Sequence, residues 1–190
     1  MNTRFNRRFG IALAAAAAGL ALVAPAAAAG AAGAVAGHNI VVNGGFEQQR
    51  SGSSQPAHWT AKGAANDFPG EGHSGSYALN LVVGPGFPKV ASVSQKVTIP
   101  ASATKATLAF WTEDWSCGDN IHFDAHVIAG GQDHIVKTIP GASCGTGYVK
   151  SSVSVKQFKG QTVTLRFAVT RVSGNQVPLF YLDDVSLVVS

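Results

Sequence analysis

Short segments of alternating apolar and polar residues make up the chain from residue 38 onward. Residues 163–169 alternate strictly, with Val163, Leu165 and Phe167 separated by polar side chains. A period of two places successive side chains on opposite faces of a β-strand. Clusters of Gly, Pro, Asn and Asp separate the segments at a spacing typical of a sandwich or barrel. The pattern predicts strands over residues 39–42, 57–62, 76–83, 90–99, 105–112, 121–129, 135–139, 149–155, 163–169 and 181–189.

The fold expected from these strands is all-β. No segment of useful length has the 3.6-residue period of a helix, and a parallel sheet would need crossover helices. We therefore predict a single domain over residues 38–190, an antiparallel two-sheet jelly-roll β-sandwich. Each side chain that faces its core should contribute about 1.5–3 kcal/mol on burial.

The first 29 residues have a different pattern. Three arginines come first, then a long apolar run, then small residues: Arg4, Arg7, Arg8, residues 9–24 and residues 25–29. This order is typical of a secretory signal peptide. A membrane anchor is the alternative, but the apolar run is short, rich in Ala and lacks a stop-transfer flank. We predict a signal peptide over residues 1–29, with cleavage near Ala29 or Ala36, and a secreted protein that leaves the membrane after cleavage.

The mature chain should be nearly neutral and begin with a disordered small-residue tail over residues 30–37. The whole chain has 14 Lys and Arg residues against 10 Asp and Glu residues, and three of the arginines lie in the predicted signal peptide. No cluster of basic and aromatic residues suggests a nucleic-acid partner. The hydrophobic content of 46% is too high for a disordered chain. No P-loop, GxSxG, HExxH or CxxC motif occurs. We also expect the protein to be a monomer.

Cys117 and Cys144 are the only cysteines, and both lie in loop-like sequences. In an exported chain they can be oxidised. We predict a disulfide between them, which would stabilise the fold by about 3–4 kcal/mol through loop closure. Two free thiols are the alternative.

The two ends of the domain carry acidic residues beside turns. Glu47 follows Gly44 and Gly45, and Asp183 has the same parity as Val185 in the last predicted strand. Parity therefore places Asp183 on the core side, where a carboxylate costs several kcal/mol unless it is paired or bound to a metal. Carboxylates and exposed carbonyls are the ligands that Ca²⁺ prefers. An Asp183 held only by a salt bridge or by N–H groups is the alternative.

Several segments together resemble the carbohydrate-binding modules of the cellulase-associated type, in the galactose-binding-like β-sandwich superfamily. These segments are VVNGGFEQ, HSGSYALNL, SVSQKVTIP, ATLAFWT and YLDDVSL, and the resemblance covers residues 39–190. It implies a non-catalytic jelly roll, a type of module often attached to glycoside hydrolases. It also implies a structural calcium bound by Glu47 and Asp183, with backbone oxygens near Gly45 and at Ser74–Tyr77 completing the shell.

A glycan-binding groove should combine aromatic platforms with polar groups. Strand parity suggests one sheet face that carries Trp111, His122, Asp124 and His126. Trp115 in the adjoining loop and Arg166 on the polar side of its own strand complete the candidate groove. The alternative for Trp111 is packing under a loop, and the alternative for Trp115 is packing against the disulfide. Trp59 and Tyr77 are expected in the core, and Phe68 and Phe87 are loop anchors or exposed platforms.

Three other functions compete with glycan binding. His122, Asp124 and His126 could hold Zn²⁺, although residues four apart on a strand need ligands from a neighbouring strand. A secreted domain of this kind could instead bind another protein. A small glycoside hydrolase would need a carboxylate pair, for which the candidates are Glu113, Asp114, Asp119 and Asp124. We expect a polysaccharide-binding protein that is not an enzyme.

Overall fold

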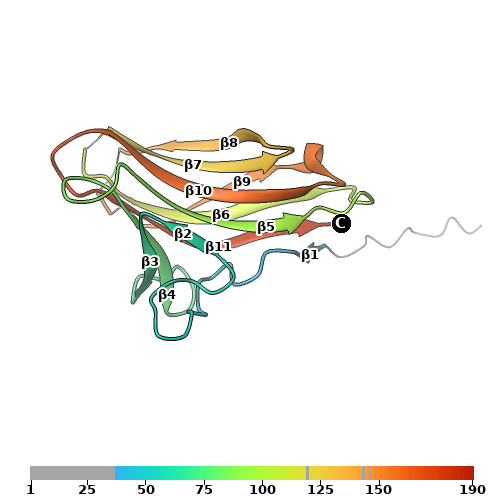
Figure 1. Ribbon diagram of the computed structural model, residues 1–190, viewed down its shortest axis with the longest axis horizontal. Coiled ribbons are helices and arrows are strands. Elements are labelled where there is room, and N and C mark those ends of the chain that lie inside the picture. Colours follow the sequence, from blue (N-terminus) through green and yellow to red (C-terminus); the bar gives the residue numbers. More distant parts are fainter. Residues whose placement is uncertain (1–36, 119, 143, 146) are drawn as a thin grey trace, which may run out of the picture. The chain divides into compact units, whose positions relative to one another are not determined.

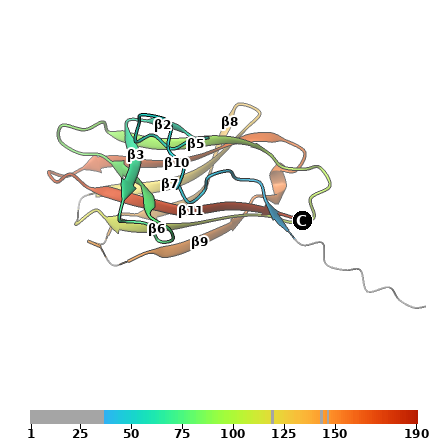
Figure 2. The ribbon, with the colours of Figure 1, turned by 90° about the horizontal axis from the view of Figure 1, so that it is seen from below.

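The computed structural model describes residues 37–190 except 119, 143 and 146. These residues form two antiparallel sheets, which Figures 1 and 2 show as two layers. The six-stranded sheet has the order β3-β4-β11-β6-β9, with β1 paired to β11: β1 (His38–Asn39), β3 (Ala64–Pro69), β4 (Tyr77–Val82), β6 (Ala106–Trp115), β9 (Val149–Ser154) and β11 (Leu179–Val189). The five-stranded sheet has the order β2-β5-β10-β7-β8: β2 (Thr60–Lys62), β5 (Val90–Thr98), β7 (Asn120–Ala129), β8 (Gln132–Pro140) and β10 (Thr162–Ser173).

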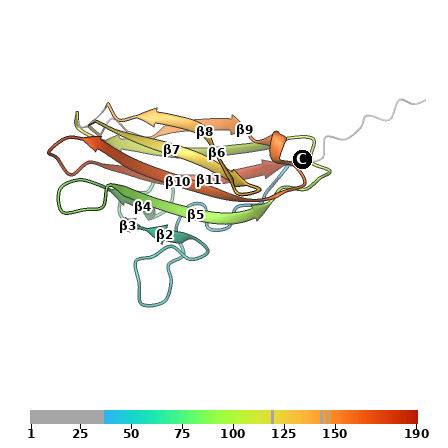
Figure 3. The ribbon, with the colours of Figure 1, turned by 45° about the horizontal axis from the view of Figure 1, so that its top comes forward.

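The predicted all-β sandwich is confirmed. The described residues contain one short 3₁₀ helix, η1 (Lys156–Phe158), and no α-helix. None of their helices is long and apolar enough to cross a membrane. The predicted signal peptide and residues 30–36 of the predicted tail lie outside the described residues and stay predictions. The long segment between β1 and β2 includes a loop that projects from the sandwich in Figure 3.

Aromatic rings from both sheets fill the core. The ring of Phe167 on β10 lies 5.2 Å from Phe110 on β6, 6.1 Å from Phe123 on β7 and 6.1 Å from Trp59, measured between centroids. All four side chains are fully buried, as predicted for Trp59. The two sheets are thus held together mainly by burial of apolar area, at about 1.5–3 kcal/mol for each large side chain.

The strand boundaries depart from the sequence pattern in places. Strand β3 was not predicted, because Ala64–Pro69 does not alternate and ends in a proline that cannot donate to a ladder. Strand β6 runs to Trp115 instead of residue 112. The prediction that Tyr77 lies in the core is wrong. Tyr77 is half-buried, because it begins β4 opposite Pro69 at the margin of the sheet.

We expect Phe167→Ala to lower the free energy of unfolding by about 3–5 kcal/mol, because it leaves a cavity among three other rings. Urea unfolding measures the change. Ile135→Ala is the control, since Ile135 is 59% exposed. Equal losses in the two variants would contradict this description of the core.

Candidate functional site

A tight turn after β1 lies directly against β11. Asn43, with φ of 53°, donates from its side-chain amide to the carbonyl oxygens of Gln48 (2.8 Å) and Ala57 (2.9 Å). A Cβ at Gly44 would lie 1.9 Å from the carbonyl oxygen of Val185, so only glycine fits there. The carbonyl of Gly44 accepts a hydrogen bond from the Val185 amide at 2.9 Å. The Asn-Gly-Gly sequence therefore fixes the start of the domain to its last strand.

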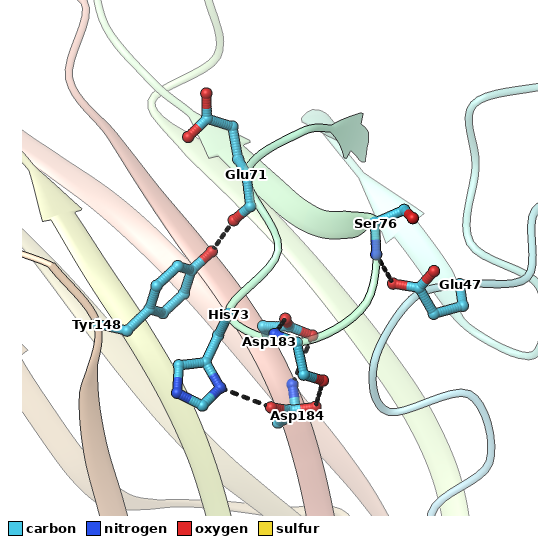
Figure 4. A network of polar contacts seen from close by, with 8 residues as sticks. Glu47, Glu71, His73, Ser76, Tyr148, Asp183 and Asp184 are labelled. Carbon is cyan, nitrogen blue, oxygen red and sulfur yellow. Dashed lines mark hydrogen bonds and ion pairs between the residues drawn. The ribbon is translucent and has the colours of Figure 1, made fainter.

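Glu47 joins this turn to the loop between β3 and β4, residues 70–76. Its Oε1 atom accepts hydrogen bonds from the backbone amides of Ser76 and Tyr77, both at 2.9 Å, and Figure 4 shows the first of them. Gly75 passes close to the same carboxylate: it has φ of 69°, and a Cβ there would lie 2.4 Å from Oε1. Glycine is therefore required at this position as well.

Asp183 and Asp184 bind the same loop from β11. Asp183 Oδ2 accepts from the Ser74 amide at 3.1 Å, and Oδ1 accepts from the Asp184 amide at 2.7 Å. Asp184 accepts from the Ser74 hydroxyl at 2.6 Å and lies 2.7 Å from Nδ1 of His73 (Figure 4). Burial raises the pKa of Asp183 to about 6, and the backbone donors oppose this rise. The loop is thus pinned by three carboxylates.

The sequence placed Asp183 on the core side, and this is wrong. Phe180 and Leu182 face the core before it and Val185 after it, because a bulge between Asp183 and Ser186 shifts the register of β11 against β6. Asp183 pairs with Trp111 and leaves the sheet on its outer face, which is the face turned away from the other sheet. Its burial comes from the loop that covers it.

The carboxylates predicted to bind calcium do lie near each other. A Cβ at Gly45 would be 3.8 Å from Asp183 Oδ1 and 3.9 Å from Glu47 Cγ, so Gly45 lies between the two residues, and Ser74 contacts Asp183. The described residues contain no group of three or more His, Cys, Asp or Glu side chains placed to hold a metal. A cation here would therefore depend on backbone oxygens for part of its shell.

Asp67 on β3 is a further acidic residue that the sequence did not single out. It is 2% exposed, and neither of its carboxylate oxygens has a hydrogen-bond partner among the described residues. Burial, and then the charge of Glu47, raise its pKa to about 7. A buried carboxylate without a donor is costly unless it is protonated or bound to a cation. Asp67 therefore places a further carboxylate, which could act as a metal ligand, near Glu47.

Trp111 lies on the outer face of the six-stranded sheet beneath His73. The two rings stack with centroids 3.8 Å apart and an interplanar angle of 19°. Tyr148 packs edge-on to His73 at 5.3 Å, and its hydroxyl donates to the carbonyl oxygen of Glu71 (Figure 4). Lys150 places its ammonium 5.8 Å from the Trp111 ring. One side of this tryptophan is therefore already occupied by the protein's own histidine.

A pocket of about 380 Å³ opens on the same outer face beside Trp111. Ala109, Ser186 and the two glycines of the first turn form its small-residue lining, and Trp111, Lys150 and Asp184 supply its larger side chains. The pocket thus combines an aromatic edge with groups of both charges next to the carboxylate-bound loop.

A row of polar and aromatic side chains crosses this outer face at Glu113, which is two residues further along β6 than Trp111. In it, Tyr181 on β11 pairs with Asn80 on β4 and with Glu113 on β6. The amide of Gly147 donates to Glu113 Oε1 at 3.1 Å, which brings the neighbouring Tyr148 to this row. Sequence reasoning named none of Tyr148, Tyr181 and Asn80 as binding residues. Tyr181 has the parity of Asp183, so recognising the bulge would have placed it on this outer face.

The four polar residues predicted to bind the ligand lie on the outer face of the five-stranded sheet, so the prediction that they share a face with Trp111 is wrong. His122, Asp124 and His126 are on β7, and Arg166 is opposite His126 on β10. Parity shows which residues of one strand share a face, but it does not show to which sheet the strand belongs. The groove expected from the sequence is therefore divided between two opposite faces.

These polar residues form two separate groups. Asp124 Oδ1 accepts from Thr138 at 2.5 Å, and Oδ2 lies 3.2 Å from His122. Asp133 on β8 contacts His126 at 2.8 Å and accepts from Arg166 at 2.6 Å. The two histidines thus have different acidic partners, which does not favour the single zinc site considered from the sequence.

The predicted disulfide between Cys117 and Cys144 is present, and Trp115 lies close to it in the chain and in space. Trp115 forms a β-bridge with Cys144, and a Cβ at Gly145 would lie 2.4 Å from its ring. One ring face is covered by Gly145, yet 39% of the residue remains exposed. Trp115 therefore packs against Gly145 and also keeps exposed surface, so both the packing role and the ligand-contact role that the sequence left open stay possible for it.

The carboxylates considered for hydrolysis are dispersed. Asp114 accepts from the backbone amides of Ser116 and Ala142, both at 2.8 Å, and so holds the loops near the disulfide. Asp124 belongs to the five-stranded sheet. Asp119 lies outside the described residues. These contacts give Asp114 a structural role.

The fold is similar to that of solved carbohydrate-binding modules, which confirms the expected β-sandwich class. The module TmCBM61, solved in complex with β-1,4-galactotriose, is 20% identical with a TM-score of 0.57, covering 79% of this chain and 97% of that chain. The CBM22-1 xylan-binding domain of Paenibacillus barcinonensis Xyn10C is 14% identical with a TM-score of 0.55, covering 82% of this chain and 97% of that chain.

Proteins of another kind share this fold. The K3 cleaved adhesin domain of Lys-gingipain from Porphyromonas gingivalis W83 is 16% identical with a TM-score of 0.55, covering 80% of this chain and 98% of that chain. No protein-family model matches the sequence, and no curated protein matches it. The similarity therefore defines the fold, and the function has to be argued from the site.

Without divalent cations, we expect stability to fall as the pH rises from about 5 to about 8, because the native state binds more protons than the unfolded chain over this range. The pKa values of Asp67 and Asp183 are raised to about 7 and about 6 from an ordinary 3.8. Asp67→Asn should flatten the dependence and stabilise the protein at the alkaline end. Urea unfolding in chelator across this range tests it, and an unchanged pH dependence in the variant would contradict it.

Proposed function

We propose that the chain is a secreted, non-catalytic module that binds polysaccharide on the outer face of the six-stranded sheet. One observation carries this proposal: five aromatic side chains that lie outside the core gather on this face. They are Phe68, Trp111, Trp115, Tyr148 and Tyr181. Among the described residues, the strands of the five-stranded sheet direct no Trp, Tyr or Phe to their outer face.

Aromatic rings combined with a few polar groups suit a sugar, whose ring has apolar faces and a polar rim. Ligand sites generally have this composition, in which apolar contacts supply affinity and polar groups fix orientation. Trp115 offers exposed ring surface, and Glu113 and Asn80 offer hydrogen-bonding groups on the same face. TmCBM61 binds β-1,4-galactotriose and the CBM22-1 domain is a xylan-binding domain, which supports a glycan ligand.

The outer face of the five-stranded sheet is the less suitable surface. Several of its charged side chains contact one another, as in the contacts of Asp133 with His126 and Arg166. A sugar bound there would have to compete with these contacts without an aromatic platform. We therefore keep His122, Asp124, His126 and Arg166 as the alternative binding surface.

We expect Trp115→Ala to weaken polysaccharide binding by about tenfold or more, since loss of a stacking platform costs roughly 1.5 kcal/mol or more. Affinity electrophoresis in galactan and xylan measures retention. Ile135→Ala on the other sheet is the control and should bind as the unaltered chain does.

Arg166→Ala distinguishes the two faces. Loss of binding in Arg166→Ala with retention in Trp115→Ala would move the site to the five-stranded sheet. If neither polysaccharide nor a wider glycan array retains the protein, glycan binding fails. A surface that binds another protein is then favoured, and the adhesin-domain similarity supports that second function.

We further propose that a structural calcium binds at the carboxylate-bound loop. Glu47 and Asp183 would be its side-chain ligands, with backbone oxygens near Gly45 and Ser74, and Asp67 is a further candidate. The donor set fits a hard cation, because it consists of carboxylate and carbonyl oxygens in a turn. The unpartnered carboxylate of Asp67 beside Glu47 supports it, since a cation would offset the desolvation of both.

Chelation is expected to lower the melting temperature by several degrees, and added Ca²⁺ should restore it, because a ligand that binds only the native state stabilises it by mass action. Glu47→Gln should abolish the calcium response, and Asp133→Asn, on the other sheet, should keep it. Thermal unfolding with elemental analysis provides the measurement. No shift together with no bound metal would reject the site.

Secretion is supported by the disulfide between Cys117 and Cys144, because such bonds form and persist mainly in oxidising compartments. It agrees with the signal peptide predicted over residues 1–29. We propose on these grounds that the domain acts outside the cytoplasm.

A further inference from the structure

Two glutamates and two tyrosines lie together on the outer face of the six-stranded sheet. Glu113 pairs with Tyr181 across β6 and β11, and Glu71 comes from the loop between β3 and β4. The hydroxyl of Tyr148 donates to the backbone carbonyl of Glu71, so the loop and the sheet are joined at this point (Figure 4). The side chain of Glu71 is not needed for that contact. We call Glu71, Glu113, Tyr148 and Tyr181 the acidic aromatic patch.

The patch contains two acidic side chains, Glu71 and Glu113, beside two tyrosines. The pKa of Tyr181 is raised by burial and then by the charges of Glu71 and Glu113. The pKa of Tyr148 is raised by burial and then by the charges of Asp183, Glu113 and Glu71. Both phenols therefore sense the same two glutamates, and a cation placed among them would be attracted by both carboxylates.

Asn80 points to an unmet hydrogen-bonding demand in this patch. It pairs with Tyr181 and faces outward with it, is 7% exposed, and has no partner for its Oδ1 atom among the described residues. Buried amide oxygens normally accept a hydrogen bond. The carboxylates of Glu71 and Glu113 are acceptors as well. The patch therefore offers acceptors to a ligand that brings donors.

Lys150 is the nearest cation on these strands, and it belongs to a different row. It pairs with Trp111 across β9 and β6, whereas Glu113 is two residues further along β6. Two residues on a strand advance about 6.6–6.8 Å. The pocket beside Trp111 is thus of mixed charge, and the acidic aromatic patch has two glutamates against this one ammonium, so its net charge is negative.

We propose that the acidic aromatic patch recognises the protonated amine of an amino sugar, so that the ligand class is a polysaccharide with free amino groups. This inference rests on the proposed glycan-binding function and names its substrate class. An ammonium group can donate to the carboxylates of Glu71 and Glu113, and it is attracted to the faces of tyrosine rings. A neutral or N-acetylated sugar lacks the charge that the patch complements.

Isothermal titration with two matched ligands tests the inference: β-1,4-linked glucosamine oligosaccharides, and the same oligosaccharides fully N-acetylated. At mildly acidic pH the deacetylated ligand should bind about tenfold more tightly or better, as expected for a charge-assisted hydrogen bond. Glu71→Gln should remove most of this preference by weakening the binding of the deacetylated ligand. Glu113→Gln, which can still accept from Gly147, should act in the same direction.

Asp133→Asn is the matched control, because it removes one negative charge from the opposite sheet and should keep the preference. Equal affinity for the two ligands would overturn the inference, and so would a preference that survives in both glutamate variants. Binding of neutral polysaccharide without any preference for amines would leave the proposed function standing. Absence of all glycan binding would reject both.

Discussion

The bulge in β11 at Asp183 and Asp184 is the constraint on which the rest of the structure depends. It reverses the faces of the last strand, so that Leu182 before it and Val185 after it both reach the core. Asp184 takes a positive φ of 49°, and the carboxylate of Asp183 emerges on the outer face. There it binds the loop between β3 and β4, which Glu47 also holds. The first turn, the last strand and this loop are therefore fixed together.

The two outer faces of the sandwich differ in their aromatic side chains. On the five-stranded sheet, histidines, acids and Arg166 pair with one another, although the Nε atom of Arg166 is buried without a partner among the described residues. No described strand of this sheet directs a Trp, Tyr or Phe outward. On the six-stranded sheet, aromatic rings stand beside acceptors, and the buried amide oxygen of Asn80 has no partner among the described residues. Because aromatic rings beside polar groups favour a sugar ligand, we propose the six-stranded sheet as the binding face.

The alternating pattern was sufficient to predict the β-sandwich, because each buried strand must place apolar residues at every second position. The disulfide was predicted separately, from two lone cysteines in a chain expected to be exported. The resemblance to carbohydrate-binding modules implied that Glu47 and Asp183 lie near each other. The alternating pattern could not show that β6 and β7 belong to different sheets, since sheet membership depends on pairing between distant segments. For this reason Trp111 was grouped with His122 wrongly. The bulge at Asp183 was also missed. It shifts the apolar positions from Phe180 and Leu182 to Val185, Leu187 and Val189, but the prediction treated the segment as one strand with a single parity.

Backbone amide chemical shifts during titration with a bound polysaccharide fragment would test the central claim most directly. Our account expects the largest shifts in β6, β11 and the loop between β3 and β4, around Trp115 and Tyr181. Shifts concentrated in β7 and β10, around His126 and Arg166, with β6 and β11 unaffected, would contradict it.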